Sequence, residues 1–287
     1  MIPQGGMYYH VQSNMEKWNN KIRELIFQSQ GIDLSQYEDV FLIKSVQKRM
    51  KETFCQSEEA YYSYLQQSTF EGEIFVKSLQ ISYTEFFRNT LTFSVLEKIL
   101  IPSIVLRKAN SNRNEIRIWS AACAGGQETY SLAMLFNEYS TCHGEKINFR
   151  IFATDQSKTQ IQEALLGEYP EQALNNLNLK RVNRWFVRQG DLFFIKPELK
   201  EHIDFSAFDL LSEQFSCPPT SIFGDFDVIV CANLLFYYKP EYQQKIIQKA
   251  CHCLSPKGYL ITGETEREIL IKSGLHEVYP QTGIFQV

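Results

Sequence analysis

The segment from Arg117 to Met134, RIWSAACAGGQETYSLAM, constrains the fold more than any other part of the chain. An apolar run around Ile118 and Trp119 gives way to Gly125 and Gly126, and a helical pattern follows. Glycines let a backbone approach a ligand closely, and the first turn of a helix offers unpaired N–H groups. The segment therefore predicts a strand, a glycine turn and a helix at a nucleotide-type or nucleoside-type site. A plain turn would also explain an isolated Gly-Gly pair.

The spacing of the glycines narrows the ligand class. It is not G-x-G-x-x-G, so a dinucleotide bound through its pyrophosphate is disfavoured. A nucleoside ligand without phosphate, such as S-adenosylmethionine (SAM), does not need that fingerprint.

The rest of the chain predicts an α/β fold. The first ~80 residues show helical periodicity and few glycines, whereas short apolar runs alternate with helical stretches further on. This alternation predicts βαβ units and a mostly parallel sheet covered on both faces. The apolar runs are Ile116–Trp119, Phe149–Ala153, Val228–Cys231 and Tyr259–Thr262, with a turn expected over Leu254–Gly258.

The alternation breaks between Glu168 and Phe205. Trp185–Val187 and Leu192–Ile195 flank a polar segment that contains Gly190, which predicts an antiparallel hairpin. Such a hairpin can serve to stabilise a loop, or its exposed edge can accept a peptide as an added strand.

Composition excludes several function classes. The net charge of −4 argues against a general nucleic-acid binder. No stretch reaches the ~20 apolar residues of a membrane span, and the start of the sequence lacks the pattern of a signal peptide. Seven cysteines without C-x-x-C indicate reduced thiols and a cytoplasmic location. Cys251 and Cys253 would point roughly 200° apart on a helix, so we expect no metal site there.

Three polar residues follow predicted strands, where open α/β sheets bind their ligands. Asp155 is placed to accept hydrogen bonds from a ribose, although it could instead cap the next helix. Asp209 could accept a bond from an adenine amine, or cap a turn. Asn233 could meet the amino-acid end of a ligand, or be one of many polar residues at strand ends.

Together these features resemble the CheR family of chemotaxis receptor methyltransferases. The resemblance is carried by TEFFR at Thr84–Arg88, WSAACAGGQETYSLAM, ATD at Ala153–Asp155, GEY at Gly167–Tyr169, CANLLFYY at Cys231–Tyr238 and LSPKGYLITGETE at Leu254–Glu266. Their order and spacing agree across nearly the whole chain.

The resemblance implies a class I SAM-dependent methyltransferase domain over residues 81–287, preceded by a helical receptor-docking domain over residues 1–80. It also implies a short antiparallel β-subdomain inserted at about residues 170–205. The implied reaction moves the methyl group of SAM to glutamate carboxylates on cytoplasmic signalling helices of chemoreceptors, leaving S-adenosylhomocysteine, with no metal, nucleic acid or membrane insertion. The residues implied to line the SAM site are Thr84, Arg88, Ala121, Gln127, Asp155, Asp209, Leu210 and Asn233.

Arg88 and Tyr237 are the candidate catalytic residues. Glutamate is ionised near neutral pH, so methyl transfer to it needs positioning and exclusion of water rather than a general base. The planar fork of Arg88 could hold the incoming carboxylate, and the Tyr237 hydroxyl could orient it. Without the family motif, Arg88 would be interpreted as an exposed arginine at a helix start. Tyr237 could alternatively be a core aromatic residue, since it stands in a run of three aromatic residues.

Two positions depart from the family pattern. Gln127 stands where an acidic residue is usual, and Ala232 stands where an arginine is usual. Loss of one charge-assisted hydrogen bond would weaken SAM binding by roughly ten- to a hundredfold. The departures leave two alternatives open, namely a methyltransferase acting on another protein and a SAM-binding regulatory protein with little activity.

Lys44, Lys48 and Lys51 would lie within about 60° of one another on a helix. The apolar residues expected on the opposite side are Leu42, Ile43, Val46, Met50 and Phe54. The three lysines can be a solvated helix face or a docking strip for an acidic receptor helix.

Overall fold

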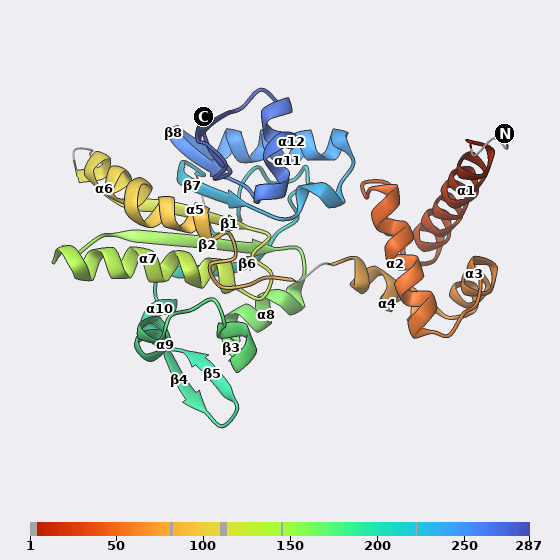
Figure 1. Cartoon of the computed structure of the whole chain (residues 1–287), viewed down its shortest axis with the longest axis horizontal. Helices are drawn as coiled ribbons and strands as arrows, with labels where there is room; N and C mark the ends of the chain where they lie inside the picture. The colour runs from red at the N-terminus through yellow and green to blue at the C-terminus, as the bar shows by residue number, and fades with distance from the viewer. Residues whose placement is uncertain (1–4, 81–82, 110–113, 145, 222) are drawn as a thin grey trace. The chain divides into compact units, whose positions relative to one another are not determined.

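The computed structural model describes residues 5–80, 83–109, 114–144, 146–221 and 223–287, with side chains from residue 17 onward (Figure 1). The chain forms two compact units. The first unit comprises residues 1–81 with residues 236–242, and the second comprises residues 82–235 and 243–287. Among the described residues, no helix combines the length and apolar character needed to cross a bilayer.

The first unit is a helical bundle, as the sequence predicts. Its helices are α1 (Gly5–Gln30), α2 (Asp39–Glu52), α3 (Glu58–Gln67) and α4 (Thr69–Leu79). Serine residues are the N-caps of α3 and α4. The Ser57 side chain accepts a hydrogen bond from the N–H of Ala60, and the Ser68 side chain accepts one from the N–H of Glu71.

The short segment 236–242 packs within this unit. Tyr238 stacks on Tyr37 with ring centroids 5.4 Å apart, and Tyr237 lies 4.9 Å from Phe41. The N–H of Glu38 donates to the carbonyl of Tyr237 at 2.9 Å. Residues far apart in sequence thus share one core.

Helix α2 has a buried face and an exposed face. Leu42 and Val46 are buried, as the periodicity predicts. Phe54 was expected on the same apolar side, but this expectation is wrong because α2 ends at Glu52. Phe54 follows with a left-handed φ of 58° and is 84% exposed.

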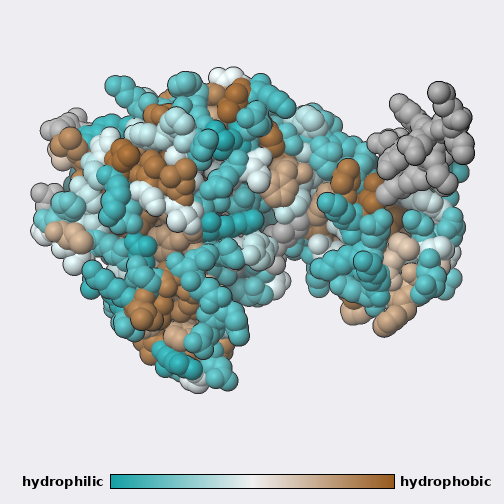
Figure 2. Space-filling view, viewed as in Figure 1, coloured by the Kyte–Doolittle hydropathy of each residue, from teal (hydrophilic) through white to brown (hydrophobic). Residues whose placement is uncertain are grey.

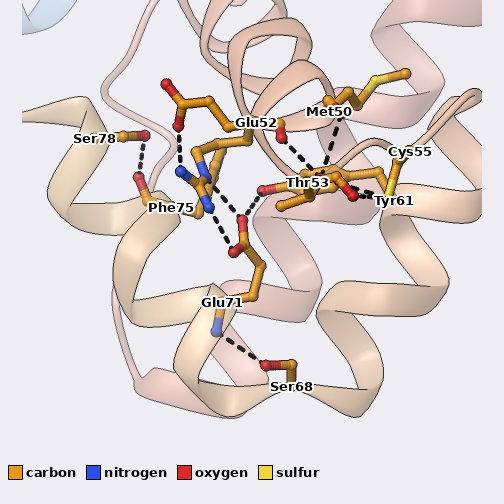
Figure 3. Close-up of polar contacts among 10 residues, drawn as sticks. Met50, Glu52, Thr53, Cys55, Tyr61, Ser68, Glu71, Phe75 and Ser78 are labelled. Atoms are coloured by element: carbon orange, nitrogen blue, oxygen red, sulfur yellow. Dashed lines mark hydrogen bonds and ion pairs between the residues drawn. The ribbon is translucent and has the colours of Figure 1, made fainter.

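A buried ion pair joins α2 to α4 (Figure 3). Glu71 accepts two hydrogen bonds from the Arg49 guanidinium, at 2.7 and 2.8 Å, and a third from the Tyr61 hydroxyl at 2.9 Å. Glu71 is 1% exposed, and burial of a carboxylate is costly unless such partners compensate for the lost water. Arg49 is therefore an internal cation that fixes the rotation of α2.

The second unit contains a seven-stranded sheet in the order β6-β2-β1-β7-β8-β10-β9. Five neighbouring strands are parallel, and β10 runs antiparallel to both β8 and β9. The strands are β1 (Ile116–Ala121), β2 (Phe149–Asp155), β6 (Ile203–Ala207), β7 (Phe226–Cys231), β8 (Leu254–Ile261), β9 (His276–Tyr279) and β10 (Ile284–Gln286).

Both faces of the central strands are buried. Every residue of β7 is buried, and β1 is buried at all positions except Arg117, which is partly exposed. This confirms the prediction of a mostly parallel sheet covered on both sides.

Helices and single turns connect and cover the strands. They are α5 (Thr90–Val95), the π-helix η1 (Leu96–Leu100), α6 (Ile101–Ala109), α7 (Gln127–His143), α8 (Lys158–Leu166), η2 (Glu171–Leu174), α9 (Leu179–Trp185), α10 (Pro197–Lys200), η3 (Leu235–Tyr237), α11 (Pro240–Cys253), η4 (Glu264–Glu266) and α12 (Arg267–Lys272).

The turn expected over Leu254–Gly258 is instead the irregular start of β8. Lys257 has a left-handed φ of 65°, and the pairing of β7 with β8 shifts its register here. A Cβ on Gly258 would lie 2.9 Å from the carbonyl oxygen of Phe226. The turn-forming residues therefore bend a strand that still pairs with its neighbour.

A separate antiparallel sheet, in the order β3-β5-β4, forms the predicted inserted subdomain. Its strands are β3 (Glu168–Pro170), β4 (Phe186–Gln189) and β5 (Leu192–Ile195). The first hairpin strand begins one residue later than expected, because Trp185 ends α9. Figure 2 shows hydrophobic side chains gathered at this subdomain, where Leu179, Val187 and Leu192 are exposed.

Candidate active site

The order of the strands collects four of the candidate residues along one edge of the sheet. Ala121 ends β1, Asp155 ends β2, and Asn233 and Asp209 follow the ends of β7 and β6. Since β6, β2, β1 and β7 are parallel neighbours, their carboxyl ends lie side by side. From β1, the strands β2 and β6 are added on one side of the sheet, and the later strands β7 and β8 are added on the other side. Open α/β sheets bind ligands at this point, where the strand order reverses.

Asp155 is anchored by backbone groups at this edge. One carboxylate oxygen accepts from the N–H of Ser157 at 2.8 Å, and the other accepts from the N–H of Ala124 at 3.0 Å. Burial raises the pKa of Asp155, and these two N–H groups oppose that rise. The cap of α8 is the side chain of Ser157. Asp155 therefore braces the turn, and each oxygen keeps acceptor capacity for a ligand hydroxyl.

The glycine turn leads directly into α7. Gly126 has a left-handed φ of 90°, and a Cβ there would lie 3.0 Å from the Cβ of Ala164, so only glycine fits without strain. The Tyr169 hydroxyl donates to the carbonyl of Gly125 at 2.7 Å and fixes the turn from the side of the subdomain.

Gln127, the first residue of α7, supplies a test of whether SAM fits this edge. Its side-chain oxygen is buried and has no hydrogen-bond partner among the residues that the structure describes. A buried acceptor without a donor is costly, so the geometry favours a ligand that donates there. The ammonium group of SAM is such a donor, and the residues present therefore fit SAM.

The segment that carries Thr84 and Arg88 is held against α7. The N–H of Phe87 donates to the Ser131 hydroxyl at 3.0 Å, and Phe87 has a left-handed φ of 50°. Arg88 donates to the carbonyl of Tyr83 at 3.1 Å and lies over its ring. Thr84 and Arg88 are both partly exposed.

Glu128, which the sequence interpretation did not single out, lies beside this segment. Its carboxyl accepts from the Ser120 hydroxyl at 2.8 Å. Burial raises the pKa of Glu128 to about 7, with a contribution from Glu266, while the Arg88 charge opposes the rise. A carboxyl that titrates near neutrality thus lies between β1 and Arg88.

Asn233, two residues beyond the end of β7, adopts a left-handed φ of 63°. Its N–H donates at 2.6 Å to Glu266, a fully buried residue after β8. A Cβ on Gly263 would lie 2.3 Å from the Asn233 amide nitrogen, so Gly263 gives this side chain its space.

Asp209 and Leu210 form the turn after β6. Asp209 is exposed and accepts from the N–H of Leu211 at 2.8 Å, as a turn residue would. Leu210 is 8% exposed. An acceptor and an apolar side chain are therefore adjacent, an arrangement that suits the edge and face of an adenine.

Tyr237, Lys44, Lys48 and Lys51 belong to the first unit. All three lysines are exposed on α2, and Tyr237 is partly buried against Phe41. Among the described residues, no group of three or more His, Cys, Asp or Glu side chains is arranged to hold a metal ion.

Glu128 and Glu266, which the structure places at this edge of the sheet, were not among the candidate residues predicted from the sequence. Both stand in segments that carry the family resemblance, in GGQET and GETE. The signal that could have found Glu266 is an acidic residue shortly after the end of an apolar strand, the same rule that selected Asp155.

A mostly parallel sheet in this strand order, with the antiparallel strand β10 near one edge and a glycine turn that lacks the pyrophosphate-binding spacing, is typical of the class I SAM-dependent methyltransferases. The profile of "CheR methyltransferase, SAM binding domain" matches residues 82–279, and that of "CheR methyltransferase, all-alpha domain" matches residues 20–79. The chain therefore belongs to the CheR methyltransferase family and is a SAM-dependent methyltransferase.

Similar proteins carry consistent names. The chain is 28% identical to the "Chemotaxis protein methyltransferase" of Borreliella burgdorferi over 86% of this chain and 87% of that protein. It is 29% identical to that of Escherichia coli over 86% and 82%. It is 34% identical to "Chemotaxis protein methyltransferase 1" of Pseudomonas aeruginosa over 68% and 69%.

Proposed function

We propose that this methyltransferase esterifies glutamate side chains on the cytoplasmic signalling helices of chemoreceptors. Membership of the CheR methyltransferase family carries the proposal, together with relatives named chemotaxis protein methyltransferases. The product left by the donor is S-adenosylhomocysteine, and the enzyme works in the cytoplasm.

The proposed donor site follows the carboxyl edge of the sheet. Asp155 holds the ribose, Asp209 and Leu210 hold the adenine, and Asn233 and the free acceptor of Gln127 hold the amino-acid end. Thr84 and Ala121 are the other residues proposed to line the SAM site. SAM, when bound, supplies a methyl group on a positively charged sulfur.

The acceptor needs orientation rather than activation. A glutamate carboxylate is ionised at neutral pH, so a lone pair is available and no base has to remove a proton. Arg88 can pair with the carboxylate through its two parallel N–H donors, which fixes the direction of the attacking oxygen. Tyr237 stays a candidate catalytic residue.

The proposed docking surface is the exposed strip of Lys44, Lys48 and Lys51 on α2. The strip presents three exposed cations, whereas Arg49 on the same helix pairs with the buried Glu71 and is largely shielded from solvent. A receptor helix rich in glutamates would be attracted to such a strip.

Substitution of Arg88 by alanine tests the proposed active site. We expect methyl transfer to receptor to be abolished while the Kd for SAM stays within a few fold of the unmodified enzyme. The matched control is Arg184→Ala, because Arg184 lies on α9 and contacts Thr141. Unchanged turnover in Arg88→Ala would remove Arg88 from the reaction.

A further inference from the structure

The carboxyl group of Glu266 is the most heavily hydrogen-bonded acid at the carboxyl edge of the sheet. Glu266 is 0% exposed and ends the turn η4. One oxygen accepts from the N–H of Leu235 at 2.6 Å. The other accepts from the N–H of Asn233 at 2.6 Å, the N–H of Gly263 at 3.0 Å and the Thr262 hydroxyl at 2.9 Å.

All four donors are uncharged, and three of them belong to the backbone. A buried carboxylate is costly unless its lone pairs are filled, and these four bonds fill most of its acceptor capacity. Burial raises the pKa of Glu266, and the bonds from Asn233, Thr262, Gly263 and Leu235 oppose the rise. Glu266 therefore binds mainly backbone groups, whereas Glu71, another buried acid, pairs with an arginine.

The loop that Glu266 holds has an unfavourable backbone conformation. Asn233 lies in the left-handed region, which non-glycine residues rarely adopt. Its N–H and that of Leu235 lie beyond the last residue of β7, outside the strand's pairing with its neighbours. Glu266 replaces the lost strand partners of both groups and links the end of β7 to the end of β8.

We propose that Glu266 is a positioning residue for methyl transfer, which holds the loop Asn233–Leu235 in the shape that receives the amino-acid end of SAM. This inference rests on the proposed placement of SAM beside Asn233. It assigns to Glu266 an effect on donor affinity that acts through the loop, without contact to the reacting atoms.

The test compares Glu266→Gln with Glu264→Gln, an exposed neighbour in the same turn. The amide of glutamine must turn one N–H donor toward the N–H donors of the loop, so at least one bond is lost. We expect the Kd for SAM, measured by calorimetry, to rise by about ten- to a hundredfold. The KM for receptor should not change, and Glu264→Gln should behave as the unmodified enzyme.

Amide hydrogen exchange separates positioning from general stability. In Glu266→Gln the amides of Asn233 and Leu235 should exchange faster, while those of Val228–Val230 in β7 keep their protection. Uniformly faster exchange across the sheet would mean that Glu266 only stabilises the fold, and would overturn the inference.

Two further variants keep the test decisive. Thr262→Val removes one of the four bonds with little change of shape, and should raise the Kd for SAM by about three- to tenfold. If Glu266→Gln does not fold and Thr262→Val binds SAM normally, the inference fails.

Asn233→Gly tests the placement of SAM by itself, because glycine tolerates the left-handed backbone at this position. If it weakens SAM binding and a folded Glu266→Gln does not, the inference fails while the placement survives. If Asn233→Gly binds SAM normally, the placement itself fails.

Discussion

The carboxylate of Asp155, at the end of β2, accepts a hydrogen bond from the backbone N–H of Ala124 in the glycine turn after β1. Ala124 has a left-handed φ of 46°, so the turn is held in a strained shape by a side chain from the neighbouring strand. One residue thereby supports the turn and, in the proposed function, binds the ribose.

Asp155→Ala should therefore weaken SAM binding in two ways. It removes the proposed hydrogen-bond acceptor for the ribose, and it removes the bond that holds the glycine turn. We expect the Kd for SAM to rise by about a hundredfold or more, since two charge-assisted bonds are involved. Calorimetry measures this directly. Asp204→Ala, which breaks an ion pair with Arg150 on the same sheet, is the control and should leave the Kd unchanged. Equal Kd values in both variants would contradict the proposed ribose site.

Gln127→Glu should strengthen SAM binding. The Gln127 oxygen is a buried acceptor without a partner among the described residues, and a carboxylate there would pair with the ammonium group of SAM. We expect the Kd to fall by about ten- to a hundredfold at pH 8. The same change at the exposed Gln156 is the control. An unchanged or higher Kd would place the ammonium group elsewhere.

Glu128→Gln should change the pH dependence of stability. Burial raises the pKa of Glu128 to about 7 from an ordinary value of 4.5. The folded state therefore binds the proton more tightly, and the stability linked to this proton is present below pH 4.5 and is lost as the pH rises through 7. The charges of Glu266 and Arg88 act on the same carboxyl in opposite directions.

Urea unfolding at pH 5 and at pH 8.5 measures this effect. From pH 5 to pH 8.5, we expect the free energy of unfolding of Glu128→Gln to rise by roughly 1 to 3 kcal/mol relative to that of the unmodified protein. This range allows for the partial solvent exposure of Glu128. Glu163→Gln, a change at an exposed acid, should show no such gain. A gain at the lower pH only would show that the sign is wrong.

Reversal of the exposed lysine charges should weaken receptor recognition. With Lys44, Lys48 and Lys51 all changed to Glu, we expect the KM for receptor to rise at least tenfold at low salt, and the KM for SAM to stay the same. The single changes Lys48→Glu and Lys77→Glu form a matched pair, because Lys77 is exposed on α4 of the same unit. Equal effects of the pair would favour a merely solvated helix face.

Glu71→Gln should destabilise the helical unit. It leaves the Arg49 guanidinium, whose side chain is 11% exposed, without its buried counter-charge. Breaking a buried pair on one side typically costs about 3 to 5 kcal/mol. Thermal unfolding of the whole chain should show an earlier transition, and Glu73→Gln at an exposed site should not. An unchanged transition would show that the pair contributes little.

The fold could be predicted from the sequence where periodicity is strong. Two-sided burial makes β1 and β7 rich in apolar residues, and both predicted runs lie within these strands. The strand β1 ends two residues later than its predicted run, and β7 begins two residues earlier. The start of β8 was not, because Pro256 and Gly258 indicate a turn locally while the pairing with β7 overrides that preference. Phe54 was misplaced because the sequence does not mark where α2 ends.

The site could be predicted only in part. Polar residues at strand ends follow from the geometry of parallel sheets, so Asp155 and Asn233 were within reach. Glu128 and Glu266 were not among the predicted residues. Glu266 does follow an apolar strand, but the donors that meet each of these carboxyl groups come from segments that only the fold brings together. The unpartnered oxygen of Gln127 is likewise a property of the folded chain alone.

The transfer of radiolabelled methyl groups from SAM to receptor-containing membranes, followed by mild base, tests the central claim most directly. Carboxyl methyl esters hydrolyse in base, so glutamate methylation predicts that the label is released as volatile methanol. Label that survives base would show a nitrogen, sulfur or ether acceptor and contradict the account. Absence of label from membranes, with SAM binding intact, would contradict it as well and favour a regulatory SAM-binding protein.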